Sequence, residues 1–195
     1  MPQQRRRRPA SEPPEVGSAA VDREPDPEEV ARAIALRLLT AAPRSRAQLS
    51  DAMARRDVPE DVADRVLDRF TEVGLVDDAA YAGALVRTRH TERGLSRVAL
   101  ANELRRKGID PATAQAALEE VDDADEESAA RTLVTRKLAA TRGLDRQTRM
   151  RRTYAALGRR GYAPGLVAKL VREALAAEGP GDGEPEPEVE LDGLG

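Results

Sequence analysis

One short segment of the sequence occurs three times, at nearly constant spacing. Residues 104–111 read Leu-Arg-Arg-Lys-Gly-Ile-Asp-Pro, residues 157–164 read Leu-Gly-Arg-Arg-Gly-Tyr-Ala-Pro, and residues 53–59 read Met-Ala-Arg-Arg-Asp-Val-Pro. The copies begin 51 and 53 residues apart. A repeat of this length is typical of a tandem array of supersecondary units, none of which buries its apolar face alone. The repeat therefore directs the search for function toward extended surfaces rather than catalytic pockets.

The segments between the repeated turns predict helices. Apolar residues recur at i, i+4 and i+8, as in Val30, Ile34 and Leu38, and no segment alternates with the period of a strand. Helix start signals recur as well, in the form of capping residues and prolines at first helical positions. These signals stand at Asp26-Pro27, Ser45 with Gln48, Pro59, Asp77, Ser96, Asp110-Pro111 and Pro164. We therefore expect an all-α fold, an elongated array of three three-helix repeats.

The two ends of the chain differ from its middle. Residues 1–27 hold six prolines, and residues 178–195 hold seven acids and no Lys or Arg. Neither segment has enough apolar surface to offset the conformational entropy lost on folding, so we expect both to be disordered. The predicted organisation is a Pro/Arg-rich head (1–27), repeats at 28–76, 77–124 and 125–177, and an acidic tail (178–195).

Several kinds of chemistry find no support in the composition. The chain has no cysteine, which excludes disulfides and thiolate sites and is compatible with the cytoplasm. Apolar runs fall short of the roughly 20 residues of a membrane helix, and the basic N-terminus lacks the apolar stretch of a secretory signal. Neither a P-loop nor a dinucleotide-binding fingerprint is present. We expect a cytoplasmic protein without enzymatic activity, cofactor, metal, membrane contact or small-molecule substrate.

Three features that invite a catalytic or metal-binding interpretation have simpler explanations. His90, the only histidine, stands at a predicted helix end, where a solvated surface residue is more common than a general base. The acidic run at 122–127 lacks the turn glycine and ligand spacing of a calcium loop, so a helix cap is favoured. Asp77 and Asp78 stand where a helix must begin, so capping is again expected.

The basic residues are concentrated late in the chain. Residues 128–177 contain 12 Lys and Arg but only Asp145 and Glu173 as acids, and such a block attracts polyanions or acidic proteins. Arginines also precede each repeated turn, where they either complement the helix macrodipole or form one binding edge. Since few aromatic residues are free to stack on bases, contact with a DNA backbone or a protein surface is favoured over base readout.

The central repeat carries a recognisable pattern. It begins with Gly-Leu-Val-Asp-Asp at 74–78 and continues with Tyr81-Ala82, Arg87, Arg89, Gly94, Ser96-Arg97, Glu103-Leu104 and Lys107-Gly108-Ile109. This pattern resembles the signature of the RecX regulatory family, and residues 159–162 resemble the closing motif of that family. The resemblance covers about residues 28–177. Leu95 departs from the family pattern, and the head and tail are not family features.

The resemblance implies a bacterial cytoplasmic regulator, mainly an inhibitor, of the RecA recombinase. Proteins of this family lodge in the groove of the recombinase–DNA filament and limit its extension, ATP hydrolysis and strand exchange. The expected partners are the RecA filament and the DNA phosphates within it. Two alternatives stay open: a DNA-binding helical repeat protein that acts without recombinase, and a helical adaptor for another protein. The candidate contact residues are Arg87, Arg89, Arg97, Arg105, Arg106, Lys107, Arg149, Arg151, Arg152, Arg159 and Arg160.

Overall fold

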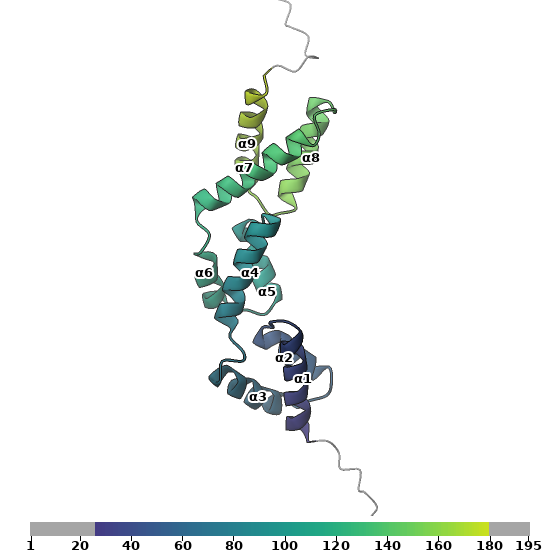
Figure 1. Ribbon diagram of the computed structural model, residues 1–195, viewed down its shortest axis with the longest axis vertical. Helices are drawn as coiled ribbons and strands as arrows, with labels where there is room; N and C mark the ends of the chain where they lie inside the picture. Colours follow the sequence, from purple (N-terminus) through teal and green to yellow (C-terminus); the bar gives the residue numbers. More distant parts are fainter. Residues whose placement is uncertain (1–25, 180–195) are drawn as a thin grey trace, which may run out of the picture.

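The protein is an elongated array of three three-helix repeats, stacked one after another along the long axis of the molecule (Figure 1). The computed structural model describes residues 26–179, and this range contains helices and no strand, which confirms the predicted fold class. The predicted disorder of the head and tail concerns residues that lie almost entirely outside the described range. Repeat 1 comprises α1 (Pro27–Ala41), α2 (Arg46–Ala54) and α3 (Glu60–Glu72); repeat 2 comprises α4 (Asp78–Arg93), α5 (Arg97–Arg106) and α6 (Pro111–Leu118); repeat 3 comprises α7 (Asp123–Ala139), α8 (Arg146–Gly158) and α9 (Pro164–Ala177).

The helices begin where the start signals predict, except that Pro59 is the N-cap of α3 rather than its first residue. The Asp26 side chain accepts a hydrogen bond from the backbone N–H of Glu28, and Ser45 and Gln48 form the reciprocal capping box. Asp77, Ser96 and Asp110 cap their helices in the same way. Helix α7 begins at Asp123, within the acidic run, because the Asp122 side chain accepts a hydrogen bond from the N–H of Asp125 and caps the helix. The acidic run is a helix start, as expected.

Each second helix ends in the same left-handed turn. The turn residues are Asp57, Gly108 and Gly161, with φ of 59°, 72° and 82°. Glycine adopts this conformation without strain, and aspartate is among the few other residues that tolerate it. The sequence repeat is thus a structural repeat, in which a helix is ended and the chain is redirected into the third helix.

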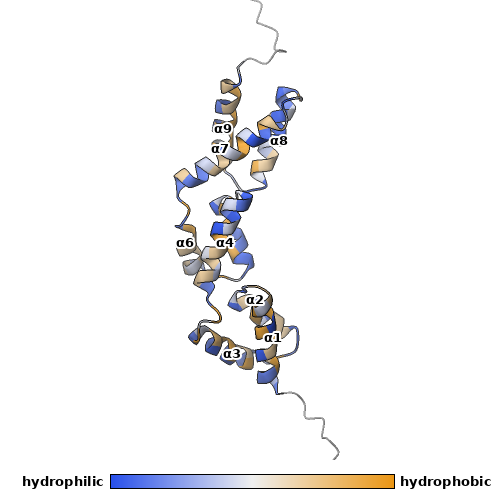
Figure 2. Cartoon of the chain, viewed as in Figure 1, coloured by the Kyte–Doolittle hydropathy of each residue, from blue (hydrophilic) through white to orange (hydrophobic). Residues whose placement is uncertain are grey.

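Each repeat has a separate apolar core that holds its three helices together. All the extensive helix–helix contacts join helices of the same repeat, and each repeat brings its three helices into mutual contact. Apolar and hydrophilic positions alternate around the helices, as amphipathic helices of small bundles require (Figure 2). Fully buried members of these cores are Leu49, Met53 and Leu67 in repeat 1, Val86, Leu100 and Leu104 in repeat 2, and Leu138, Leu157 and Leu170 in repeat 3. Each repeat therefore has an apolar core of its own, and the expectation that no unit buries its apolar face alone was wrong.

Candidate protein and nucleic-acid interface

The candidate contact residues fall into two groups, those engaged in internal contacts and those left exposed. Four of the engaged residues form ion pairs, and in three of them the ion pair is the only hydrogen-bonded contact of the side chain within residues 26–179. Arg87 pairs with Glu120 (Nη1–Oε2 2.8 Å), Arg97 with Asp123 (Nη1–Oδ1 2.8 Å), and Arg89 with Glu103 (Nε–Oε1 2.9 Å). The Arg89–Glu103 pair is the most sheltered, with 28% and 14% of the two side chains exposed. These arginines are paired with carboxylates of other segments, so only part of their charge is presented to an external anion.

Arg149 and Arg160 are engaged more deeply. The Arg149 Nη2 donates to the carbonyl of Leu138 (3.1 Å) and to the Glu178 carboxylate (2.7 Å), and only 12% of the side chain is exposed. Arg160 donates from Nε to the carbonyl of Arg93 (2.9 Å) and from Nη1 to that of Ala156 (3.0 Å). Charge-assisted bonds of this kind are stronger than neutral ones. Both residues therefore hold the fold together.

The other candidates lie on the surface. Arg105 donates to the side chain of Asn102 (2.8 Å) and is exposed. The remaining side chains make no hydrogen bond or ion pair with any other residue in 26–179. They are Arg106, Lys107, Arg151, Arg152 and Arg159, of which Lys107 is half-buried and the others are exposed. Uncompensated cations of this kind attract anionic partners.

Two of these free cations face the same hollow. A groove of about 330 Å³ runs between repeats 2 and 3, with Arg106 on one side and Arg159 on the other. We call it the basic groove. Its lining consists of Leu95, Ala99, Asn102, Arg106, Gly158, Arg159 and Gly161. Because the lining holds no aromatic side chain, the groove suits phosphate or carboxylate groups and offers no surface for base stacking.

Two rows of side chains extend the basic groove along the neighbouring helices. Arg152 of α8 precedes Arg159, the C-cap residue of that helix, by seven residues, and residues at that spacing point in nearly the same direction. On α5, Val98, Asn102 and Arg105 share one face at i, i+4 and i+7. Val98 is 62% exposed, an uncommon position for a valine. The surface therefore combines a cationic row with an apolar contact point suited to protein.

Two residues of this interface were missed by the sequence-based expectation, and His90, which does not line the basic groove, differs from it. Val98 and Asn102 were not among the predicted contact residues, because only the packing of α5 decides which of its faces is covered. His90 is half-buried rather than solvated, with Nδ1 3.1 Å from the carbonyl oxygen of Leu95. The ring therefore supports the turn after α4, and the expectation of a solvated residue was wrong.

Other kinds of site find no support within residues 26–179. This range contains no group of three His, Cys, Asp or Glu side chains arranged to hold a metal ion. The residues of the acidic run instead contact basic or backbone groups: Asp123 pairs with Arg97, and Glu126 accepts from the N–H of Arg97. Among the described helices, none has the length and apolar character needed to cross a bilayer.

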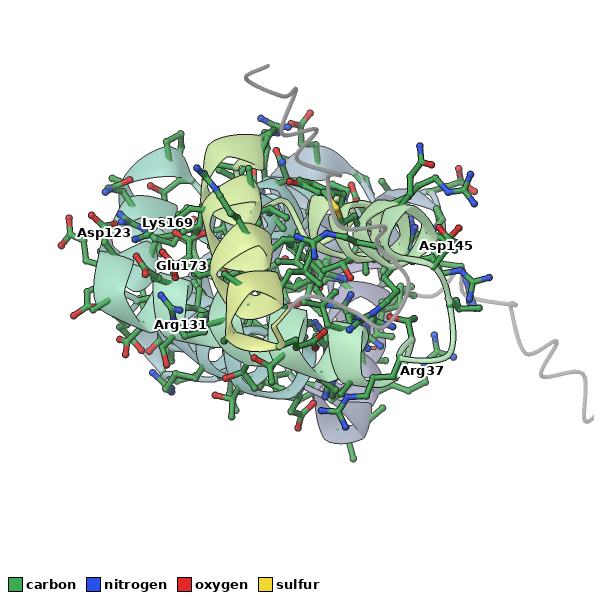
Figure 3. The ribbon with its side chains drawn as sticks, turned by 90° about the horizontal axis from the view of Figure 1, so that it is seen from above. Arg37, Asp123, Arg131, Asp145, Lys169 and Glu173 are labelled. Atoms are coloured by element: carbon green, nitrogen blue, oxygen red, sulfur yellow. The ribbon has the colours of Figure 1, made fainter. Side chains whose placement is uncertain are left out.

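Part of the basic block in repeat 3 is neutralised by an exposed ion-pair network between α7 and α9. Glu127 contacts Arg131 (2.9 Å) and Lys169 (3.1 Å), and Arg131 also contacts Glu173 (2.8 Å). Figure 3 shows Arg131, Lys169 and Glu173 on the same side of the molecule when it is seen along its axis. Hydrogen bonds from Lys169, and then from Arg131, lower the pKa of Glu127 below its usual value of 4.5. The charged form of Glu127 therefore stabilises the folded state.

Stability should depend on pH through this network. Because folding lowers the pKa of Glu127, its contribution is complete above about pH 4.5 and is lost as the pH falls through the folded-state value. We expect Glu127→Gln to lower the melting temperature at pH 7 by on the order of 1–2 °C, since exposed pairs are weak. The difference from wild type should shrink near pH 3 and in 1 M salt, as thermal scans by circular dichroism would measure. Glu119→Gln, at an exposed residue without an ion pair in the described range, is the control; equal effects of the two changes would contradict the interpretation.

Comparison with known proteins covers all three repeats. Residues 31–70 match the family model described as the first three-helix domain of RecX, residues 77–118 match the second, and residues 125–171 match the third. The order of the three matched domains is the order of the three repeats.

Curated relatives carry the same name. The chain is 58% identical over 149 residues to "Regulatory protein RecX" of Thermobifida fusca, covering 76% of this chain and 80% of that protein. It is 54% identical over 154 residues to the protein of that name from Streptomyces lividans (79% and 82% covered), and 47% identical over 156 residues to that from Mycobacterium ulcerans (80% and 90% covered).

Solved structures show the same fold. The crystal structure of RecX from Lactobacillus salivarius matches with a TM-score of 0.67 at 20% identity, covering 77% of this chain and 98% of that one. A second crystal structure, of a regulatory protein RecX, matches with a TM-score of 0.64 at 22% identity, covering 76% and 72%. The arrangement of three helical repeats is thus common to sequences that have diverged widely.

Proposed function

Because this chain belongs to the RecX family of regulatory proteins, we propose that it regulates the RecA recombinase, mainly as an inhibitor. In this proposal the chain binds the recombinase–DNA filament in the cytoplasm and limits filament extension, ATP hydrolysis and strand exchange. It does so by binding alone and catalyses no reaction. The observation that carries the proposal is the match of all three repeats, in order, to the three domains of the family.

The shape of the array supports binding to a filament. Three repeats in a row offer several contact surfaces, so weak contacts with successive protomers add through effective concentration. The row of Val98, Asn102 and Arg105 on α5 combines apolar and cationic character, which suits a protein surface. Arg106, Arg152 and Arg159 supply charge for DNA phosphates, and phosphate contacts position a protein without reading sequence.

Recombinase ATPase activity tests the proposal directly. We expect the protein, added at substoichiometric amounts to recombinase on single-stranded DNA, to reduce ATP turnover at steady state, because a bound array obstructs filament extension. Electron microscopy of the same samples should show shorter filaments. Unchanged turnover together with unchanged filament length would contradict the proposal.

The basic groove also favours a second candidate, a DNA-binding helical repeat protein that acts without recombinase. Gel shifts on bare single-stranded DNA over a salt series separate the two candidates. Tight binding that weakens steeply with salt, without any effect on recombinase turnover, would support the second. Reduced turnover with weak binding to bare DNA would support the first.

A further inference from the structure

The two joints between repeats are built from the same parts. At each joint, the start of the second helix of one repeat meets the left-handed turn that ends the second helix of the next repeat. Joint 1–2 brings the start of α2 (Ser45 to Ala47) against the turn at Lys107 and Gly108. Joint 2–3 brings the start of α5 (Ser96 to Ala99) against the turn at Arg160 and Gly161.

A buried serine forms the centre of each joint. Ser45 is fully buried; its Oγ accepts the capping bond from the N–H of Gln48 (3.3 Å) and donates to the carbonyl oxygen of Lys107 (2.5 Å). Ser96 is also fully buried; its Oγ accepts from the N–H of Ala99 (3.2 Å), and its own N–H donates to the carbonyl oxygen of Arg160 (3.0 Å). In both joints the acceptor is the carbonyl immediately before the turn glycine. Each serine thus caps its own helix and binds the next repeat.

A carboxylate from the next repeat completes each joint. The backbone N–H of Arg46 donates to Asp78 Oδ1 of α4 (2.8 Å), and the N–H of Arg97 donates to Glu126 Oε1 of α7 (3.1 Å). Both donors stand in the first turn of a helix, where backbone N–H groups have no partner within the helix. In both joints, an equivalent backbone N–H without a partner in its own helix therefore binds the following repeat.

The turn glycines are also points of very close approach. A Cβ added to Gly108 would lie 2.3 Å from the Cβ of Ala47, and a Cβ added to Gly161 would lie 2.6 Å from Ser96 Oγ and 3.0 Å from the Cβ of Ala99. Nonbonded carbon atoms prefer separations of about 3.5–4.0 Å, so an added methyl group at Gly108 requires the two repeats to separate by more than about 1 Å. These glycines serve the joint as well as the left-handed turn.

The equivalent turn in repeat 1 supports this interpretation. It holds Asp57 at φ 59°. No repeat precedes repeat 1 within the described residues, so no helix start packs against this turn, and Asp57 is exposed. A left-handed turn alone accepts aspartate, whereas the two turns that lie in joints hold glycine. The choice between aspartate and glycine at these three positions therefore depends on whether the turn lies in a joint, and not on its left-handed conformation.

We propose that these two joints set the curvature of the array, and that one added methyl group at Gly108 or Gly161 opens the corresponding joint while each repeat stays folded. Each core lies within one repeat, and extensive contacts between helices of different repeats are absent from the described range. The relative orientation of repeats 1 and 2 therefore depends on the few bonds of joint 1–2. That of repeats 2 and 3 depends on joint 2–3 together with the Arg97–Asp123 ion pair and the bond from Arg160 to the carbonyl of Arg93. The proposal concerns the isolated chain and does not depend on recombinase binding.

Spin-label distances across the joints test this proposal in the isolated full-length chain. Since the chain has no cysteine, pairs of introduced cysteines can be labelled selectively. Ala54→Cys with Ala116→Cys spans joint 1–2, and Ala116→Cys with Ala177→Cys spans joint 2–3; all three alanines are exposed. We expect Gly108→Ala to shift or broaden the distance distribution across joint 1–2 and to leave that across joint 2–3 unchanged.

Two matched variants separate opening of the joint from strain in the turn. Gly74 also has a left-handed backbone (φ 72°), but a Cβ there meets nothing within 4 Å, so Gly74→Ala adds the same kind of strain without a clash. We expect Gly74→Ala to leave both distance distributions unchanged. Combining Ala47→Gly with Gly108→Ala removes the clashing Cβ from the other side and should restore the wild-type distribution across joint 1–2.

Two results would overturn the proposal. One is a joint 1–2 distribution in Gly108→Ala that equals that of Gly74→Ala. The other is a loss of about one third of the helical circular dichroism signal in Gly108→Ala. That loss would mean that repeat 2 unfolds when the joint opens. A changed distribution with the full helical signal, reversed by Ala47→Gly, supports the proposal.

Discussion

Reversing the charge of Arg106, Arg152 and Arg159 to glutamate is expected to remove most of the binding to single-stranded DNA and to the recombinase–DNA filament. Two of these arginines line the basic groove, the third continues its row on α8, and none is engaged by another side chain in the described range. Since each lost phosphate contact lowers the salt slope of single-strand binding by about 0.7, the slope should fall by about 2. At low salt we expect affinity to drop on the order of tenfold or more.

Fluorescence anisotropy on labelled single-stranded DNA, with recombinase ATPase in parallel, measures both effects. The control reverses Arg37, Arg136 and Arg172, which are exposed, have no ion-pair partner within residues 26–179 and do not line the basic groove. Both triple variants change the net charge equally, so a general electrostatic effect would lower affinity to the same degree in each. Equal losses would place the binding surface elsewhere.

Leu104→Ala is expected to destabilise repeat 2 by about 2–5 kcal/mol, the usual range for a buried leucine replaced by alanine. Leu104 is fully inaccessible and belongs to the core formed by α4, α5 and α6. Because that core is separate from the other two, the loss should be confined largely to repeat 2. Urea unfolding should then show an earlier first transition, in which about one third of the helical signal is lost, as expected for a quasi-one-dimensional array.

Hydrogen exchange locates the loss within the chain. Amides of α4 to α6 should exchange faster in Leu104→Ala, whereas those of the α7 and α9 interiors should keep their protection. The control is Val98→Ala on the same helix, where the side chain is largely exposed and the effect should stay within about 0.5 kcal/mol. A single transition in which all three repeats lose protection together would show that the joints couple the cores strongly.

The number, order and starting points of the helices were readable from the sequence, because their causes are local. A capping side chain such as Asp26 or Ser45 bonds to a backbone N–H two or three residues away, and apolar periodicity marks the buried face of each helix. The positions of the three repeated turns were readable for the same reason, and the structure added that all three are left-handed. Where the prediction differed, as at Pro59 before α3, the helix start lay only one residue away.

The family was also readable from the order and spacing of residues 74–109, and the match of all three domains confirms it. The contact residues taken from that resemblance stay a prediction. The sequence grouped Arg149 with Arg151 and Arg152 as one basic cluster. In the fold, Arg149 turns inward and reaches Glu178, 29 residues away, while its two neighbours stay exposed.

Amphipathic periodicity and helix caps depend on neighbours along the chain. The sequence alone therefore determined, over residues 26–179, nine helices in three like units and the family to which they belong. Which cations stay unpaired, and how each repeat is attached to the next, depend on partners brought together from distant positions. Arg160 and Arg93, or Ser45 and Lys107, are in contact only because the termini of helices from different repeats lie side by side. Contacts between such distant residues produce no local pattern of hydropathy or charge in the sequence, so only the tertiary structure decided them.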